Sequence, residues 1–455
     1  MNLYRDNEFN IAKKLHYASL VVDTHNDTMM KVINPITWLP KNNLGANTGF
    51  QIDLPKLRAG GLKVVFFSAF TSGFARNSFQ RSNSIILALL NALQWTADNN
   101  KDSLQIATNH SSILDITKDG RIAAIPTIEG AYSLNASNAI ELLRQYYDLG
   151  VRGIALQWNY SNPLGEGASK KYKNGKPSSG GLTELGRSVV KEMNRLGMMV
   201  DVSHMAEETF WDVIETSTAP IIASHSGVYC IKKHPRNLTD QQLKSLAAKG
   251  GVIQIVFFPG FLSDGEASIS TIVDHIDYVV ELVGVDYVGL GSDFDGARMP
   301  KDLPDASYVY RITEELVIRG YSASEIEGIL GKNSLRLLKK VEELSENQIK
   351  ADKDIMTPSF CSGDRLQGDT PLLEAAVKLP TGTELNPDSI RVILDGIAYN
   401  GFYDSSNKII HYKPTEPLKE RFHVVTFEAT DTLGNSFRNT SIFYINRNWL
   451  LKQSS

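Results

Sequence analysis

Val21-Val22-Asp23-Thr24-His25-Asn26-Asp27 is a short apolar run that ends in a histidine and an aspartate two residues apart. Side chains in a β-strand alternate between its two faces, so His25 and Asp27 are expected to point the same way. An imidazole and a carboxylate directed at one point form half of a metal site. The stretch gains meaning because four further candidate ligands recur along the chain, each at the end of an apolar run.

Between residue 20 and about residue 295, β-rich runs alternate with helix-patterned stretches. The predicted strands cover residues 20–23, 62–70, 121–128, 152–158, 198–203, 220–224, 251–258 and 286–292. Predicted helices cover residues 183–197, 206–215, 239–248 and 269–283, and two closing helices cover 306–319 and 324–344. Several strands are continuous apolar runs, as is typical of buried parallel strands. Eight strands alternating with helices predict an α/β fold, the (β/α)₈ TIM barrel.

The chain has 455 residues, which favours two domains. Beyond the predicted barrel, residues 389–395 and 422–429 show the period-two alternation of strands, and residues 431–435 form a turn signal before another strand candidate at 436–445. We therefore predict a barrel domain over residues 1–348, an irregular linker over 349–369 and a small all-β, immunoglobulin-like sandwich over 370–455.

The bulk composition excludes several classes of function. A net charge of -4 gives no reason to expect nucleic acid or an anionic membrane as a partner. No apolar run approaches the roughly 18 residues of a transmembrane segment, and the polar N-terminus has no signal peptide. The expected compartment is the cytoplasm, or the exterior if a leader has been removed. With only two cysteines, Cys230 and Cys361, the chain has neither a disulfide framework nor a cysteine-ligated zinc site.

Polar residues follow the C-terminal ends of the predicted strands, where TIM barrels have their catalytic residues. They are His25 and Asp27 after the first strand, Glu129 after the third, His204 after the fifth, His225 after the sixth and Asp293 after the eighth. Three nitrogens and one or two carboxylates suffice for one zinc ion, and a bridging carboxylate would let the set hold two. The implied reaction class is hydrolysis of an amide, ester or phosphoester.

Each of these residues also has a simpler interpretation. Glu129 before Gly130 could cap the following helix, and Asp293 and Asp295 could form a turn beside Gly296. A single histidine after a strand is more often a cap or a satisfied core group than a ligand. Among the other histidines, we expect His16, His110 and His275 at the surface, and we discount His411 and His423 as members of the C-terminal module.

One arginine is a candidate substrate-binding group. Arg236 lies in the loop after the sixth predicted strand, next to His234, which has no evident role. A fixed guanidinium at the mouth of a metal site can hold a substrate carboxylate through two hydrogen bonds. A solvated loop arginine fits the spacing equally well.

Taken together, the motifs resemble those of the renal (membrane) dipeptidase family of zinc metallopeptidases. They are Asp23-Thr24-His25-Asn26-Asp27, Glu129-Gly130, Asp201-Val202-Ser203-His204, Ser224-His225-Ser226, Pro235-Arg236-Asn237 and Gly291-Ser292-Asp293-Phe294-Asp295-Gly296. The resemblance runs from about residue 16 to residue 345 and looks like a bacterial-type member with an appended β-module.

The resemblance implies a dipeptidase with two zinc ions, which often tolerates a D-residue at the C-terminal side of the substrate. His25 and Asp27 would bind one ion, His204 and His225 the other, and Glu129 would bridge them. Asp293 would contact the substrate amine and shuttle a proton. The implied mechanism is attack by a metal-bridging hydroxide on the peptide carbonyl, stabilisation of the oxyanion by zinc, and proton transfer to the leaving amine.

By the same resemblance Arg236 would hold the substrate carboxylate, so that two charged clamps exclude longer peptides. The sequence departs from the family at one position. Where mammalian members carry a histidine thought to hold the tetrahedral intermediate, this chain has Trp158, whose indole can donate a hydrogen bond but cannot become cationic. The partners expected are dipeptide substrates; a homodimer stays open, and the β-module would contact another protein, a surface or a subunit.

Two other functions remain open. An amidohydrolase-type metal enzyme acting on N-acyl amino acids usually carries two histidines after the first strand, whereas this chain has His25 and Asp27. A catalytically silent barrel that only binds metal is the second alternative, and an intact ligand set argues against it.

Overall fold

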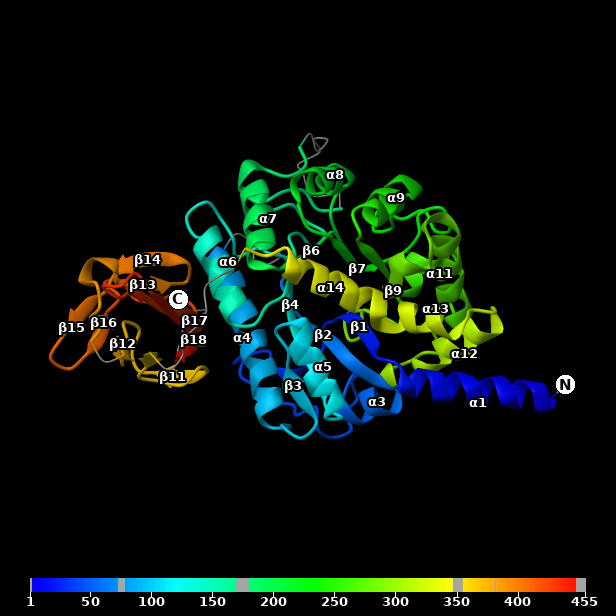
Figure 1. Ribbon diagram of the computed structural model, residues 1–455, viewed down its shortest axis with the longest axis horizontal. Helices are drawn as coiled ribbons and strands as arrows, with labels where there is room; N and C mark the ends of the chain where they lie inside the picture. The colour runs from blue at the N-terminus through cyan, green and yellow to red at the C-terminus, as the bar shows by residue number, and fades with distance from the viewer. Residues whose placement is uncertain (1, 73–77, 169–179, 347–354, 381, 447–455) are drawn as a thin grey trace, which may run out of the picture.

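The computed structural model describes residues 2–72, 78–168, 180–346, 355–380 and 382–446, with side chains from residue 9 onward. A barrel forms the body of the molecule, with the N-terminal helix α1 (Asn2–Ala18) at one end and a module of β-strands at the other (Figure 1).

The predicted barrel is confirmed. Its strands are β1 (Val21–Asn26), β2 (Leu62–Phe70), β4 (Ile122–Glu129), β5 (Gly153–Ala155), β6 (Met199–Asp201), β7 (Ile222–Ser226), β8 (Val252–Ile255) and β9 (Val288–Leu290). They pair in this order, and all pairs are parallel. Between β9 and β1 the backbone N–H of Asp27 donates to the Phe294 carbonyl (2.9 Å) and that of Asp293 to the His25 carbonyl (3.0 Å). The sheet is therefore nearly closed at the level of the candidate site.

Two strands differ from the prediction in an informative way. β1 runs on to Asn26, so that His25 lies within the strand and not after it, because the polar residues at its end are buried and hydrogen-bonded. A ninth strand, β3 (Leu104–Ile106), pairs only with β4 outside the barrel order. Three residues are too few for a period-two pattern to reveal such a strand.

Helices surround the strands. The longer ones are α4 (Phe79–Asp98), α5 (His110–Lys118), α6 (Ala139–Asp148), α7 (Glu184–Leu196), α8 (Glu207–Thr216), α9 (Asp240–Ala248), α11 (Ile269–Val283), α12 (Tyr310–Ile318) and α14 (Asn333–Glu343). Short helices are α2 (Met29–Val32), α3 (Leu54–Ala59), α10 (Pro259–Leu262) and α13 (Ala323–Glu327). Thr183 and Thr239, the first residues of two predicted helices, both accept a backbone N–H, and Gly197 closes α7 with a left-handed φ of 78°.

The C-terminal module consists of two sheets that enclose a core of their own. One sheet has the order β10 (Met356–Pro358), β12 (Leu373–Val377), β16 (Ile409–Tyr412) and β15 (Phe402–Asp404). The other has the order β11 (Asp364–Leu366), β18 (Ser436–Ile445), β17 (Phe422–Thr430), β13 (Arg391–Leu394) and β14 (Ile397–Asn400). An all-β module is thus confirmed.

The predicted irregular linker over 349–369 is wrong where the structure describes it, over residues 355–369. β10 and β11 lie within it, and they pair with β12 and β18 of the module. Three-residue strands formed by pairing with distant segments leave no local pattern in the sequence. Residues 349–354 lie outside the described part of the chain.

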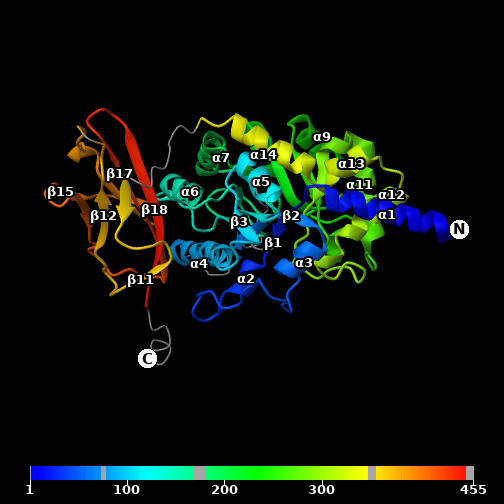
Figure 2. The same cartoon turned by 60° about the horizontal axis from the view of Figure 1, so that its bottom comes forward.

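The module packs directly on helices α4 and α6 of the barrel (Figure 2). Phe422, Val424 and Ile442 belong to the same buried apolar cluster as the barrel helices. Gln145 of α6 donates to the Ile393 carbonyl (2.9 Å) and accepts the N–H of Gly396 (2.8 Å). Barrel and module therefore share a continuous core, in contrast to domains joined only by a linker.

The prediction that His16 and His275 lie at the surface is also wrong, since both side chains are fully buried. The ring nitrogens of His16 contact the Thr313 hydroxyl (2.8 Å) and the Gly60 carbonyl (2.7 Å). His275 is bonded at both nitrogens as well. Satisfying both nitrogens offsets the cost of burying an imidazole, and these partners are distant in sequence.

In the part of the chain that the structure describes, none of the helices is both long enough and apolar enough to cross a membrane.

The shared core predicts that the module stabilises the barrel. Phe422→Ala is expected to lower the free energy of unfolding by about 3–5 kcal/mol, because it opens a cavity in the joint core. Denaturant unfolding followed by circular dichroism of the barrel helices measures this. Phe402→Ala is the matched control, since Phe402 is 70% exposed on the same module. A barrel that unfolds at an unchanged midpoint in Phe422→Ala would contradict the shared core.

Candidate metal centre

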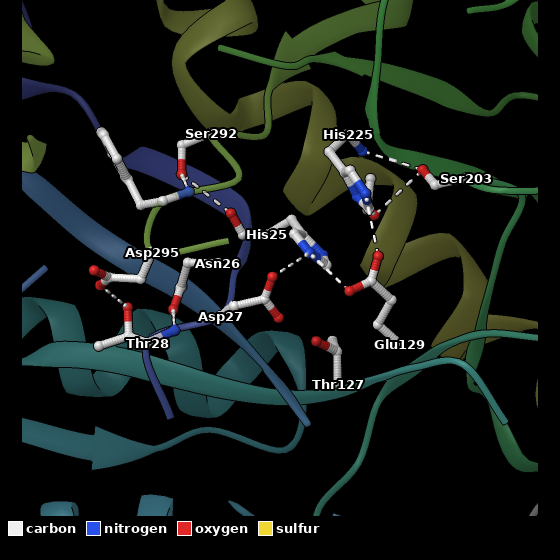
Figure 3. A network of polar contacts seen from close by, with 12 residues as sticks. His25, Asn26, Asp27, Thr28, Thr127, Glu129, Ser203, His225, Ser292 and Asp295 are labelled. Carbon is white, nitrogen blue, oxygen red and sulfur yellow. Dashed lines mark hydrogen bonds and ion pairs between the residues drawn. The ribbon is translucent and has the colours of Figure 1, made fainter. Parts of the chain in front are cut away.

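The structure brings all five predicted metal ligands together at the C-terminal mouth of the barrel. His25 and Asp27 lie at the end of β1, Glu129 is the last residue of β4, His204 lies just beyond β6, and His225 is in β7. All five are buried. Figure 3 shows the imidazoles of His25 and His225 directed at the Glu129 carboxylate, with the Asp27 carboxylate beside His25.

Glu129 lies between the two groups of ligands. Its Oε1 is 2.7 Å from His204 Nε2 and 3.3 Å from His225 Nε2, whereas its Oε2 is 3.5 Å from His25 Nε2. Asp27 Oδ2 is 3.9 Å from the same nitrogen of His25. One carboxylate thus faces three imidazoles, as a bridging ligand would.

The partners of the outer ring nitrogens decide which nitrogen of each imidazole carries its proton. The Ser224 hydroxyl donates to Asp201 Oδ2 (2.5 Å) and therefore accepts the Nδ1–H of His225 (2.9 Å). The Asn159 side-chain oxygen likewise accepts the Nδ1–H of His204 (2.9 Å). Both Nε2 atoms are left with lone pairs, 2.9 Å from one another and facing the Glu129 carboxylate. These lone pairs and the carboxylate repel one another unless a cation binds between them.

Unsatisfied polar atoms at the same place support this reading. His25 Nε2 and Asp27 Oδ1 are buried and have no hydrogen-bond partner within the part of the chain that the structure describes. Burying such atoms without a partner costs free energy, so an absent ligand is the natural explanation. Compact groups of donor atoms are formed by His25, Glu129 and His225, and by His25, Asp27 and Asp293. Buried nitrogen and carboxylate donors without cysteine fit zinc.

The buried ionisable side chains of the centre have strongly shifted pKa values. Burial lowers the pKa of His204 to about 3 and that of His225 well below its usual range, so both are neutral, as metal ligands must be. Burial opposes the charged forms of Glu129 and His25, but their mutual attraction outweighs it. The pKa of Glu129 is held well below its usual range and that of His25 well above. The carboxylates thus attract positive charge to the centre.

Asp293 lies beside the centre in a tight turn after β9. It has a left-handed φ of 64°, and His204 (67°) and Asp295 (63°) share this rare backbone conformation. Burial raises the pKa of Asp293 to about 8, to which the charges of Asp27 and Glu129 contribute. A carboxyl group in this environment is suited to holding and releasing a proton near neutral pH.

Arg236, in the loop after β7, is buried close to the centre, so it is not a solvated loop arginine. Its Nη2 donates to the His225 carbonyl (3.1 Å), and its guanidinium lies 5.2 Å from the ring centre of Phe261. Its Nε is buried and has no partner among the described side chains and backbone groups, and burial lowers the pKa of Arg236 to about 10. Arg236 therefore retains hydrogen-bonding capacity for an anionic ligand.

A cavity of about 640 Å³ opens on the centre. Asp27, Glu129, His204 and Asp293 line it on the polar side, and its apolar lining consists of Met30, Phe70, Trp158, Phe258 and Phe261. The Trp158 ring packs 5.8 Å from that of His204 and 5.3 Å from that of Phe70. A second hollow of about 350 Å³ is lined by His204 and Arg236. Every predicted site residue thus lies at one mouth.

The sequence reasoning missed the supporting residues Asp201, Ser224 and Asn159. Asp201 also accepts the backbone N–H groups of Ser203 (2.9 Å) and Ser224 (3.0 Å), which joins the ends of β6 and β7. Ser224 directly precedes His225 and Asp201 lies three residues before His204, within the motifs quoted above, and that proximity was the available signal. Their role depends on pairing between strands, which the sequence does not display.

Comparisons with known proteins identify the family of the chain. The model of the membrane dipeptidase family, peptidase family M19, matches residues 9–352. An uncharacterised dipeptidase from Schizosaccharomyces pombe is 35% identical over 350 residues, which is 72% of this chain and 82% of the relative.

Solved structures are similar as well. A metallopeptidase from Rhodobacter sphaeroides, liganded with a phosphinate mimic of the dipeptide L-Ala-D-Ala, is 27% identical with a TM-score of 0.63, and the match covers 71% of this chain and 99% of that one. A probable dipeptidase from Pseudomonas aeruginosa, 23% identical, shares the fold with a TM-score of 0.67 over 75% of this chain and 100% of that one.

The hydrogen-bond chain from Asp201 to His225 generates a prediction. Ser224→Ala is expected to weaken zinc binding about 10- to 100-fold, because the His225 ring loses the partner that fixes its orientation and tautomer. Competition with a chromophoric chelator measures the affinity. Ser226→Ala is the matched control, since the buried Ser226 hydroxyl has no partner among the described residues. Equal affinities in the two variants would remove Ser224 from this role.

Proposed function

The chain belongs to the membrane dipeptidase family, peptidase family M19, and we propose that it hydrolyses dipeptides with two zinc ions bound at the mouth of its barrel. The observation that carries the proposal is the Glu129 carboxylate, which lies within 3.5 Å of the Nε2 atoms of three imidazoles. A single carboxylate with both oxygens so placed is suited to bridging two cations.

The residues of the centre divide into two ligand groups around Glu129. His25 and Asp27 would hold one ion, and His204 and His225 the other. Zinc supplies a Lewis acid that polarises a carbonyl and lowers the pKa of water to near neutrality. The chain itself supplies the neutral imidazoles of His204 and His225, held in the correct tautomer among buried side chains.

Two charged groups would hold the two ends of the substrate. Arg236, buried and with free hydrogen-bonding capacity, would bind the substrate carboxylate. Asp293 would accept a hydrogen bond from the substrate amine and pass a proton to the leaving nitrogen, for which its raised pKa suits it. A clamp at each end favours dipeptides over longer peptides, because a longer chain has no carboxylate at the required distance.

The cavity is suited to binding substrates with different side chains. Its apolar lining, with Met30, Phe70 and Trp158, would accept a substrate side chain, and Trp158 would contact the substrate from beside His204. The relative from Rhodobacter sphaeroides binds a mimic of L-Ala-D-Ala. We extend to this chain the proposal that a D-residue is tolerated at the C-terminal position.

A panel of dipeptides tests the proposal. L-L and L-D dipeptides should be hydrolysed by the zinc-loaded protein and not after removal of metal with a chelator, and zinc analysis should give two ions per chain. N-acyl amino acids serve as the comparison set, since they lack the free amine that Asp293 would bind. Turnover of the acyl compounds alone would point to an amidohydrolase, and metal binding without any turnover to a silent barrel.

Arg236→Ala is expected to raise KM for dipeptides about 10- to 100-fold, because it removes a charge-assisted contact with the substrate carboxylate. The measurement compares a dipeptide with its C-terminal amide. The native protein should prefer the free acid strongly, and the variant should lose that preference. A preference that survives in Arg236→Ala would assign carboxylate recognition to another residue.

A further inference from the structure

We infer that the C-terminal β-module positions the loop that follows β1, residues 28–53, and that Arg421 is the positioning residue through which it does so. The inference rests on the proposed function for its kinetic readout only. It assigns to the module a role in substrate binding at a site that the module does not itself line among the described residues.

The loop carries one wall of the substrate cavity. Helix α2 begins the loop and bears Met30, which lines the cavity. A compact hairpin follows α2 directly, closed by hydrogen bonds from the Asn34 N–H to the Leu39 carbonyl (2.9 Å) and from the Trp38 N–H to the Asn34 carbonyl (2.7 Å). The Lys41 N–H returns to the Val32 carbonyl at the end of α2 (2.8 Å). Hairpin and α2 are therefore expected to move as one unit.

Arg421 holds the tip of this hairpin from the module. It lies immediately before β17, is 7% exposed, and its Nη1 donates to the Thr37 carbonyl (2.9 Å). The next residue in the hairpin, Trp38, has a left-handed φ of 58°, and the Arg81 guanidinium of α4 lies 5.2 Å from its ring centre. Figure 2 shows the loop between α2 and α3 beneath α4, which lies against the module.

Both ends of the loop are joined to the turn that carries Asp293. Asp295 Oδ1 accepts the backbone N–H of Gln51 (2.9 Å), and Asp295 Oδ2 accepts the Thr28 hydroxyl (2.8 Å). The Gln51 side chain in turn accepts the N–H of Asp295 (2.5 Å). The loop thus has an anchor at the metal centre and a second anchor on the module, with the cavity wall between them.

A buried guanidinium bonded to a carbonyl is a strong and directional contact, because the donor is charged. Without it, the hairpin tip would lose its charged hydrogen bond to the module. A small displacement of groups that bind the substrate weakens productive binding without changing the chemistry. The effect of Arg421 should therefore appear in KM and in the protection of the loop, and less in kcat or in metal content.

The test uses Arg421→Met in the full chain, which keeps the apolar stem and removes the donor. Hydrogen–deuterium exchange of residues 33–41 should become at least about threefold faster, with and without zinc. KM for a dipeptide of the panel should rise about three- to tenfold, with kcat within about twofold. Arg421→Lys keeps a charged donor, so its exchange rate and KM should lie between those of the native protein and those of Arg421→Met. It provides the same readouts if Arg421→Met fails to fold.

Arg438→Met is the matched control. Arg438 is equally buried on the module, but its Nε donates to Asp148 of α6 (2.5 Å). Arg438→Met should lower the free energy of unfolding of the protein and leave hydrogen–deuterium exchange of the loop and KM unchanged. Native exchange and KM in Arg421→Met, or equal changes in both variants, would overturn the inference. If no dipeptide is hydrolysed, the proposed function fails, and loop exchange alone still decides the role of Arg421.

Discussion

The buried carboxylate of Glu129 is the constraint on which the arrangement of the barrel mouth depends. It lies at the end of β4 with the lone pairs of His204 and His225 before one oxygen and the imidazole of His25 before the other. Taking these groups out of water is costly unless a cation neutralises them. The ends of β1, β4, β6 and β7 therefore have to meet at one point, which a nearly closed barrel achieves.

The surrounding hydrogen bonds keep this assembly in one protonation pattern. Asp201 and Ser224 act on His225, and Asn159 acts on His204, so that both inner nitrogens keep their lone pairs. The same pairing ties β6 to β7, and thus one set of contacts serves both closure of the barrel and chemistry. A metal-dependent dipeptidase needs this order before substrate arrives, because groups that must reorganise during the reaction lose catalytic power.

The β-module is part of the barrel's structure as well as an appended unit. Phe422 enters the barrel core, and Arg421 beside it reaches the loop after β1. The sequence predicted an all-β module correctly from the alternation in residues 422–429 and 436–445. It placed the beginning of the module too late, because β10 and β11 are held by pairing with distant strands and have no pattern of their own.

The sequence by itself determined the barrel, the family and the candidate ligands. Period-two alternation aims His25 and Asp27 at one point, and parallel strands gather their carboxyl ends at one mouth. The tertiary structure decided which nitrogens face the centre, that His16 and His275 are core residues, and that the module contacts the loop after β1. Arg421 and Thr37 lie 384 positions apart. Contacts between residues so far apart in the chain depend on how the elements pack, and no local sequence pattern predicts them.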